Sequence, residues 1–161
     1  MLKLYSRADG VLSYWETWDK NDKTGIVHWG TVGETGQNKE VTSSLLKTFR
    51  SKIQNEISQK QNEGFEEVDL DDHAILLIEF KVEGMGTAQD IEKRTRLQKV
   101  MDSLLGWTGL GYCDGGSIGS GTMEVCCYVI DFDIAKTVVE QKLKDSEFAD
   151  YIRIYNENEE E

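Results

Sequence analysis

Side chains able to do acid–base, nucleophilic or metal chemistry are few in this chain of 161 residues. The two histidines, His28 and His73, lie in differently patterned regions, and neither belongs to a recognisable nucleophile–histidine–carboxylate motif. The three cysteines, Cys113, Cys126 and Cys127, lack the Cys-x-x-Cys spacing of a metal site. We therefore predict a protein that is not an enzyme and that holds no metal and no cofactor.

The cysteines also indicate the redox environment. Cys126 and Cys127 are adjacent, and neighbouring residues of a strand point to opposite faces, so they are not expected to bridge each other. An odd number of cysteines makes a poor disulfide framework, and we expect all three thiols to be reduced. No apolar run approaches the roughly 18 residues of a membrane span, and the N-terminus lacks the apolar stretch of a signal peptide. We expect a soluble, cytoplasmic protein with no membrane partner.

A glycine-rich run occupies residues 109–121. Glycine loops bind phosphate when they follow a strand and open a helix, whereas this run follows a predicted helix and precedes a predicted strand. It also lacks the Lys-Ser or Lys-Thr ending of a P-loop. We predict a hairpin with flexible or bulged strands, whose glycine-rich edge suits the docking of a partner, with Asp114 and Ser117 as candidate contacts.

Asp131 and Asp133 lie on one strand face and are a conceivable pair of cation ligands. Residues of this type more often cap the helix that follows, and we favour the cap. If this protein were an enzyme after all, its active site would have to be built on this aspartate pair or on the glycine-rich run.

The most distinctive segment is Val27-His28-Trp29-Gly30-Thr31-Val32-Gly33-Glu34-Thr35-Gly36. Farther along, Phe49 falls in a predicted helix and a Gly64-Phe65 pair follows that helix. Together these features resemble the signature of the WGR domain, a small sheet-plus-helix module of poly(ADP-ribose) polymerases and some bacterial regulator-like proteins. The resemblance covers residues 1–66. We expect Gly30 to allow a close backbone approach, and Gly33 and Gly36 to occupy turns with positive φ.

In the polymerases, the Trp and Arg of the motif help to engage DNA. The resemblance implies that Trp29, with Lys39, Lys47 and Arg50, is a candidate nucleic-acid contact. The motif arginine is replaced here by Thr31, which keeps a hydroxyl but lacks the charge and the fork geometry of arginine. Acidic residues are interspersed among these cations, so a WGR fold kept for its shape is the other interpretation.

A second aromatic cluster is Tyr14-Trp15-Glu16-Thr17-Trp18. In a strand, Trp15 and Thr17 would point to one face of the sheet, and Tyr14, Glu16 and Trp18 would point to the other. An exposed set beside Trp29 would form a hot spot for a protein or a stacking platform for bases, whereas burial of both sets would make them core. The candidate partner contacts in this half are Trp15, Trp18, Trp29 and Thr31.

The elements that position these residues follow from periodicity. In the first half we predict strands at 1–6, 11–18, 26–32 and 37–41, with a hairpin turn over 19–25. Apolar residues at three- and four-residue spacing predict an amphipathic helix over 42–62, with Gly64 as its stop. Its inner face would carry Leu45, Leu46, Phe49, Ile53 and Ile57.

In the second half we predict a central strand at 74–82, followed by a helix that begins with a Thr87–Asp90 capping box. Strands then run through 109–130, a second helix begins after Asp131 or Asp133, and a last strand lies at 151–155. The buried stripe of the first of these helices would be Ile91, Leu97, Val100, Met101, Leu104 and Leu105. The β-α-β-β-α-β order indicates a ferredoxin-like domain. The predicted fold class is α+β, with a WGR-like domain at 1–66, an acidic connector at 67–73, a ferredoxin-like domain at 74–156 and a frayed acidic tail at 157–161.

The formal net charge is −12, and its distribution is uneven. Residues 1–68 carry 9 basic and 10 acidic residues, whereas residues 69–161 carry 9 basic and 20 acidic residues. An acidic surface attracts basic proteins and repels phosphate backbones. We predict a non-enzymatic, bacterial binding protein whose acidic second domain engages a basic protein partner, as an immunity protein, antitoxin or adaptor does. The alternative is a nucleic-acid-binding, DNA-damage or regulatory accessory protein that acts through its WGR-like domain.

Overall fold

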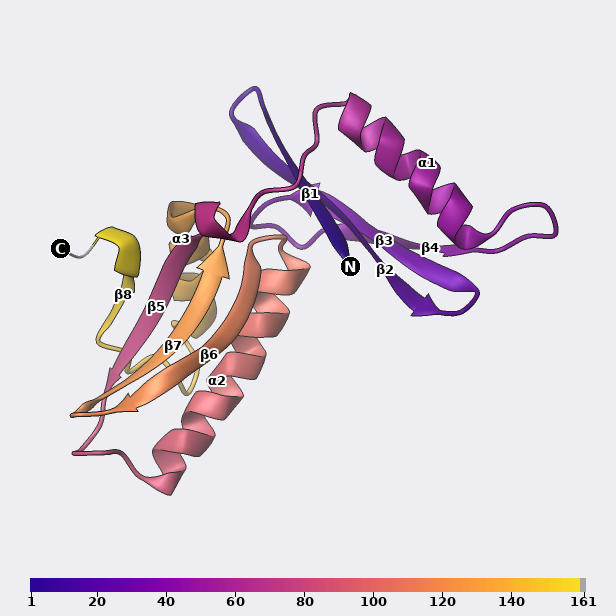
Figure 1. Cartoon of the computed structure of the whole chain (residues 1–161). Helices are drawn as coiled ribbons and strands as arrows, with labels where there is room; N and C mark the ends of the chain where they lie inside the picture. The colour runs from indigo at the N-terminus through magenta and orange to yellow at the C-terminus, as the bar shows by residue number, and fades with distance from the viewer. Residues whose placement is uncertain (160–161) are drawn as a thin grey trace. The chain divides into compact units, whose positions relative to one another are not determined.

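A computed structural model describes residues 1–159 of the chain (Figure 1). Within these residues the architecture is α+β, with two four-stranded antiparallel sheets and three α-helices. The chain divides into two compact units, Met1–Asp69 and a second unit that begins at Leu70. Among the described residues, no helix combines the length and the apolar character needed to cross a membrane.

The first unit is a meander followed by a helix. Its strands are β1 (Leu2–Ala8), β2 (Val11–Asn21), β3 (Thr24–Thr31) and β4 (Gln37–Thr42), paired in chain order. The strands β2 and β3 extend farther than predicted, so the turn between them is confined to Asp22 and Lys23. Cross-strand pairing in this long hairpin places Trp15 opposite Trp29.

Helix α1 (Phe49–Asn62) begins seven residues later than the predicted helix over 42–62. Two hydroxyls fix its start: the Thr48 side chain accepts from the Ser51 N–H as the N-cap, and the Ser43 Oγ accepts from the Phe49 N–H. The prediction that Leu45 and Leu46 lie on the inner face of the helix is therefore wrong, because both are fully exposed before it. Gly64, with φ +88°, follows the helix as predicted.

The core of the first unit lies between one face of the sheet and α1. Its buried members are Leu4, Trp15, Val27, Phe49 and Ile53, with Trp29, Ile57 and Phe65 packed against them. Gly25 makes this packing possible, since a Cβ there would lie 2.5 Å from the Ile53 side chain and 2.9 Å from that of Phe49.

The second unit contains β5 (Ala74–Lys81), α2 (Ala88–Trp107), β6 (Gly111–Gly119), β7 (Thr122–Val129), α3 (Phe132–Leu143) and β8 (Arg153–Asn156). Its strand order is β6-β7-β5-β8, so β5 is a central strand as predicted. The glycine-rich run forms the edge strand β6, whose register with β7 shifts between Cys113 and Gly116. The predicted bulged hairpin is confirmed.

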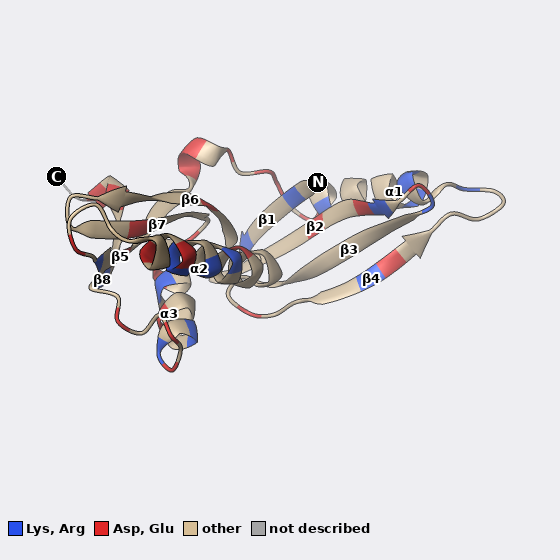
Figure 2. Cartoon of the chain, turned by 90° about the horizontal axis from the view of Figure 1, so that it is seen from below, with Lys and Arg blue, Asp and Glu red and all other residues tan. Residues whose placement is uncertain are grey.

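One face of the second sheet is covered by helices. Along β7 every second residue is buried, namely Met123, Val125, Cys127 and Val129. Figure 2 shows α2 and α3 on the same side of the sheet. Their buried residues are Leu97, Met101 and Leu105 on α2, and Ala135, Val139 and Leu143 on α3. Among the described residues, no α-helix of this unit lies on the opposite face of the sheet.

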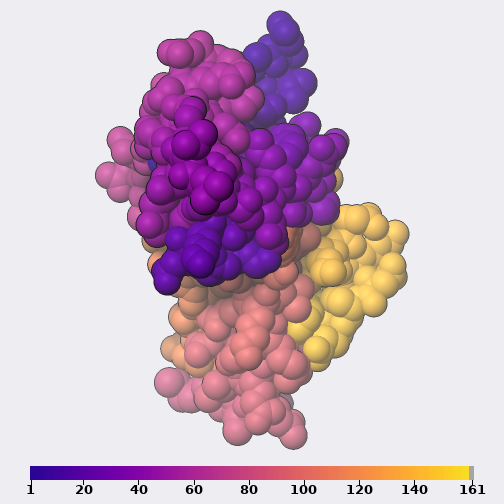
Figure 3. Space-filling view, turned by 90° about the vertical axis from the view of Figure 1, so that its right-hand side faces the viewer, coloured from indigo at the N-terminus to yellow at the C-terminus, as the bar shows by residue number. Residues whose placement is uncertain are grey.

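The helix caps agree with the sequence. Thr87 and Asp90 form the predicted capping box of α2, and Asp131 caps α3 through the Ile134 N–H. The outer side of α2 belongs to the molecular surface (Figure 3). Ile91 of this helix is exposed, so the prediction that it belongs to the buried stripe is wrong. In the tail, Glu157–Glu159 form a 3-10 turn in place of the predicted frayed end, and residues 160–161 lie outside the described part of the chain.

Candidate functional site

The helix-free face of the second sheet carries a row of polar side chains across all four strands. Register places Ser117 of β6 opposite Glu124 of β7, Glu124 opposite Glu79 of β5, and Glu79 opposite Arg153 of β8. Two carboxylates therefore stand directly opposite each other at the centre of the sheet. Like charges in this relationship destabilise a sheet unless other groups compensate them.

Each of these carboxylates has its own partners. The Arg153 guanidinium donates to Glu79 Oε2 at 3.0 Å and lies over the ring of Tyr155, 3.9 Å from its centroid. Glu124 instead accepts from two hydroxyls, the Tyr155 Oη at 2.5 Å and the Ser117 Oγ at 3.1 Å. Hydroxyl donors leave the charge of Glu124 in place. Burial and the bond to Glu124 together raise the pKa of Tyr155.

Two further tyrosines stack on the same face. The ring centroids of Tyr112 and Tyr128 lie 5.5 Å apart with an interplanar angle of 21°, and Tyr112 is 38% exposed. The exposed Asp114 follows in the bulge, and its charge adds to the effect of burial in raising the pKa of Tyr112. We call this surface the tyrosine–carboxylate face: Glu79, Tyr112, Asp114, Ser117, Glu124, Tyr128, Arg153 and Tyr155.

The free edge of β6 is less open than its glycines suggest. The Cys113 N–H donates to Asp102 Oδ1 of α2 at 3.3 Å, and Arg94 Nη1 of the same helix lies 3.5 Å from the Gly116 carbonyl oxygen. Side chains of α2 thus occupy part of the hydrogen-bonding edge that an added strand would need. The predicted contacts Asp114 and Ser117 are exposed, and we place the candidate site on the face and not on the edge.

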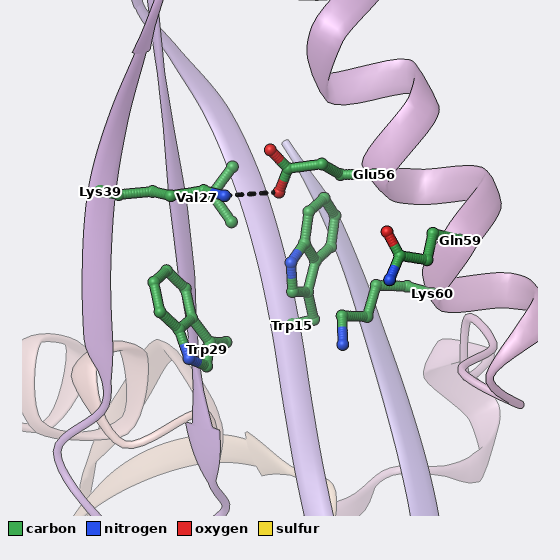
Figure 4. A pocket seen from close by; sticks show the side chains of 7 residues that line it. All are labelled: Trp15, Val27, Trp29, Lys39, Glu56, Gln59 and Lys60. Carbon is green, nitrogen blue, oxygen red and sulfur yellow. Dashed lines mark ion pairs between the residues drawn. The ribbon is translucent and has the colours of Figure 1, made fainter.

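In the first unit, a groove of about 400 Å³ lies between the sheet and α1 (Figure 4). We call it the tryptophan groove, and its lining is Trp15, Val27, Trp29, Lys39, Glu56, Gln59 and Lys60. Trp15 is only 2% exposed, so it supplies buried support and little contact surface. Trp29 is half-buried, with Lys39 Nζ 5.8 Å from its ring centroid.

The cations predicted to contact nucleic acid are largely paired with acids. Lys39 Nζ lies 3.0 Å from Glu56 Oε2, and Arg50 Nη2 lies 2.6 Å from Asp19 Oδ2. Lys47 is exposed in the segment before α1. These pairs neutralise the charge that a phosphate backbone would require.

The two remaining candidate contacts of the first unit, Thr31 and Trp18, lie at different places along the β2–β3 hairpin. Thr31 is half-buried at the end of β3. Trp18 is also half-buried and makes an edge-on contact with His28, with the ring centroids 6.2 Å apart. His28 points away from the α1 side of the sheet, so Trp18 and Trp29 do not form the single aromatic cluster that the sequence suggested.

Sequence reasoning missed a buried polar network on the face of the first sheet opposite α1. His28 Nδ1 lies 2.7 Å from Glu16 Oε1, and His28 Nε2 lies 3.1 Å from the Tyr14 hydroxyl, so the imidazole bridges the two side chains by hydrogen bonds. Lys3 Nζ lies 3.3 Å from the other Glu16 oxygen. Strand alternation puts Tyr14 and Glu16 on one face, but only the register of β2 with β3 brings His28 beside them.

This network has the order of a hydroxyl–imidazole–carboxylate triad without access for a substrate. His28 has no exposed surface, and Tyr14 is almost fully buried. Burial, followed by the charge of Glu16, raises the pKa of Tyr14 to about 12, so its hydroxyl stays protonated and is a poor nucleophile. The network is an internal support for the sheet.

Two glycines of the segment around Trp29, Gly30 and Gly36, lie against this network. Gly33 has φ +93°, as predicted, whereas Gly36 does not adopt positive φ. Gly36 is required for space, because a Cβ there would lie 2.0 Å from the Tyr14 Oη and 2.4 Å from the Trp29 carbonyl oxygen. At Gly30 a Cβ would lie 3.0 Å from the Gly36 Cα, which agrees with the predicted close approach.

Across residues 1–159, no cluster of three or more His, Cys, Asp or Glu side chains is arranged to hold a metal ion. Comparisons of the chain with protein-family models, with curated proteins and with solved structures found no match.

Proposed function

We propose that this chain is a non-enzymatic binding protein that recognises a basic segment of a partner protein through the tyrosine–carboxylate face. Such a role is that of an immunity protein, an antitoxin or an adaptor. The observation that carries the proposal is that this face already binds an arginine of the same chain: Arg153 is held by the ring of Tyr155 and the carboxylate of Glu79. Aromatic rings and a carboxylate also occur together a few residues away on this face, and the described strands of this sheet contain no arginine besides Arg153.

That second position centres on the stacked Tyr112 and Tyr128. The exposed ring of Tyr112 offers a π-face to a cation, and Asp114, whose charge acts on the pKa of Tyr112, supplies a carboxylate in the same strand. Glu124 lies four residues from Tyr128 along β7, on the same face. Guanidinium groups bind well to this combination, since they stack on aromatic rings while donating to carboxylates. A segment with arginine or lysine is therefore the occupant with complementary charge.

The long-range field favours the same partner. The acidic excess of the chain lies in residues 69–161, which comprise the whole second unit and the one residue before it. A field of this sign raises the rate of encounter with cationic proteins and is damped over about 8–10 Å at physiological salt. Association with a basic partner should weaken as salt rises.

A peptide titration tests the proposal. The probe is a short peptide with alternating arginine and glycine, its control has glutamate in place of arginine, and calorimetry at low and physiological salt measures binding. Asp114→Asn and Tyr112→Ala should each weaken binding of the arginine peptide by about tenfold, the equivalent of about 1.4 kcal/mol. Glu140→Gln removes the same charge from the exposed side of α3 and should change the affinity little.

The proposal fails if the arginine peptide binds no better than the glutamate peptide. It also fails if Glu140→Gln weakens binding as much as Asp114→Asn does, because binding would then follow net charge and not this face.

We also propose fold relationships for the two units. The order β6-β7-β5-β8, with helices after the first and third strands of the unit, supports a ferredoxin-like split βαβ arrangement for the second. The antiparallel sheet, the following helix and the Trp29-Gly30 pair support a WGR-like module for the first.

The half-buried Trp29 beside two lysines of the tryptophan groove favours a second candidate function, nucleic-acid binding by the first unit. A mobility-shift assay with nicked and blunt-ended duplex at low salt tests it. Trp29→Ala should weaken binding, and Thr31→Arg, which restores the motif's charge, should strengthen it. Absence of a shift with both the unmodified chain and Thr31→Arg would remove this candidate.

A further inference from the structure

Cys113 and Cys127 occupy directly opposite positions of strands β6 and β7. The Cys113 N–H donates to Asp102 of α2, so it points away from β7. This direction identifies Cys113 and Cys127 as a non-hydrogen-bonded pair, in which opposite Cα atoms lie about 4.5 Å apart. Disulfides span Cα separations of about 4.4–6.8 Å, so the backbone already has the spacing that a bond between these residues needs.

The side chains of the pair also meet. Directly paired residues point to the same face of a sheet, and here that is the face covered by α2. The two thiols are close enough for each to shift the pKa of the other, and the Cys113 Sγ also lies 3.9 Å from the Gly115 carbonyl oxygen. Cys127 is fully buried, whereas Cys113 is half-buried at the sheet edge. Cys126 points to the opposite face and is excluded from this contact.

We propose that Cys113 and Cys127 are a site of reversible disulfide formation, with a low-molecular-weight disulfide as the oxidant. The Cys113 thiolate attacks one sulfur of the oxidant, which forms a mixed disulfide and releases one thiol. Cys127 then loses its proton and attacks the Cys113 sulfur, which releases the second thiol. Two protein thiols are oxidised by two electrons, and one oxidant disulfide is reduced to two thiols.

The environments of the three thiols set the order of these steps. The hydrogen bond from Cys127 lowers the pKa of Cys113, whereas that bond and burial raise the pKa of Cys127. Burial raises the pKa of Cys126 to about 11. Because the thiolate is the nucleophile, Cys113 is the attacking thiol and Cys127 the resolving one.

The bond would close the hairpin next to its bulge. Cys113 is the last residue of β6 in regular register before the shift, and the exposed Asp114 follows it directly. A covalent link at this position fixes the bulge to β7. The inference rests on register and contacts alone and does not depend on the proposed function.

The experiment treats the reduced full-length protein with oxidised glutathione under native conditions. Free thiols are then counted after denaturation, and the expected result is one remaining thiol of the three. Cleavage after Glu124 by a glutamate-specific protease separates Cys113, in residues 93–124, from the other two cysteines, in residues 125–140. Under non-reducing conditions these two peptides should run as one linked species.

Cys126→Ser is the matched control and should form the bond as the unmodified protein does, which assigns the partner as Cys127. Cys113→Ser should abolish the link, and Cys127→Ser should stop the reaction at glutathione-modified Cys113. Circular dichroism of each reduced variant checks folding. Three free thiols after treatment, a stable mixed disulfide in the unmodified protein, or loss of the link in folded Cys126→Ser would each overturn the proposal.

Discussion

Arg153 lies over the ring of Tyr155, with its guanidinium 3.9 Å from the ring centroid, and it donates to Glu79 from that position. The sheet face thus binds an arginine of its own chain by the same means as those proposed for a partner. It also prevents Glu79 and Glu124 from standing opposite each other uncompensated. The relationship links the stability of the sheet to the chemistry of its surface.

Removal of Arg153 should therefore strengthen binding of a cationic peptide. Arg153→Ala leaves the Glu79 carboxylate and the Tyr155 ring available to an incoming arginine, and we expect affinity for the arginine–glycine peptide to rise by about threefold to tenfold, or about 0.6–1.4 kcal/mol. Arg96→Ala, which removes an equal charge paired with Glu147, is the control. Equal gains from both variants would show that net charge alone is responsible.

Gly36 should be intolerant of a side chain. A Cβ there meets the Tyr14 hydroxyl and the Trp29 carbonyl oxygen, so we expect Gly36→Ala to lower the free energy of unfolding by about 1–3 kcal/mol. Gly106→Ala, at a helical position with open space around the Cβ, should be neutral or stabilising. Urea titration followed by tryptophan fluorescence measures Gly36→Ala, because three of the four tryptophans, Trp15, Trp18 and Trp29, are in the first unit. An unchanged midpoint would contradict the packing described here.

The first unit should lose stability at alkaline pH. The pKa of Tyr14 rises from 10.0 to about 12 on folding, chiefly through burial. Above pH 10 the unfolded chain has released this proton while the folded chain still holds it, so the stabilisation declines as pH rises through about 10–12. Tyr14→Phe should reduce this decline without removing it, because burial also raises the pKa of Tyr5 in the same unit. The variant should cost about 1 kcal/mol at neutral pH for the lost hydrogen bond. Urea titrations at a series of pH values test it, and an equal slope for both proteins would contradict it.

The late start of α1 gives another test. Phe49 is buried in the core, and Phe49→Ala should destabilise the first unit by about 3–5 kcal/mol. Leu45→Ser and Leu46→Ser alter fully exposed side chains, so each should change stability by less than about 0.5 kcal/mol. A large loss from either leucine variant would indicate that the helix begins earlier.

Local signals in the sequence were enough for much of the fold. The start or end of a helix depends on a few residues close together in the sequence. The structure contains all three of the predicted signals of this kind, namely the Thr87–Asp90 capping box, the Asp131 cap and the Gly64 stop. Leu45 and Leu46 misled the prediction because their spacing matched a helix, whereas Ser43 and Thr48 provide caps that start it later. Spacing alone does not show which of two competing signals prevails.

The candidate sites depended on strand register, which no single segment contains. Tyr14, Glu16 and His28 meet only because β2 and β3 pair as they do. In the same way, Glu79, Glu124 and Arg153 come from separate strands of the second sheet. The sequence could place Asp114 and Ser117 on a glycine-rich hairpin, but it could not show that Ser117 begins a row of polar side chains that crosses the sheet through Glu124 and Glu79.

The most direct test of the central claim is to map the bound peptide by NMR. On addition of the arginine–glycine peptide, we predict the largest shifts at Tyr112, Asp114 and Tyr128, together with the Tyr155 ring, and little change along α3. Shifts concentrated in the tryptophan groove or on the helices, or no shifts at all, would contradict the assignment of this face as the binding surface.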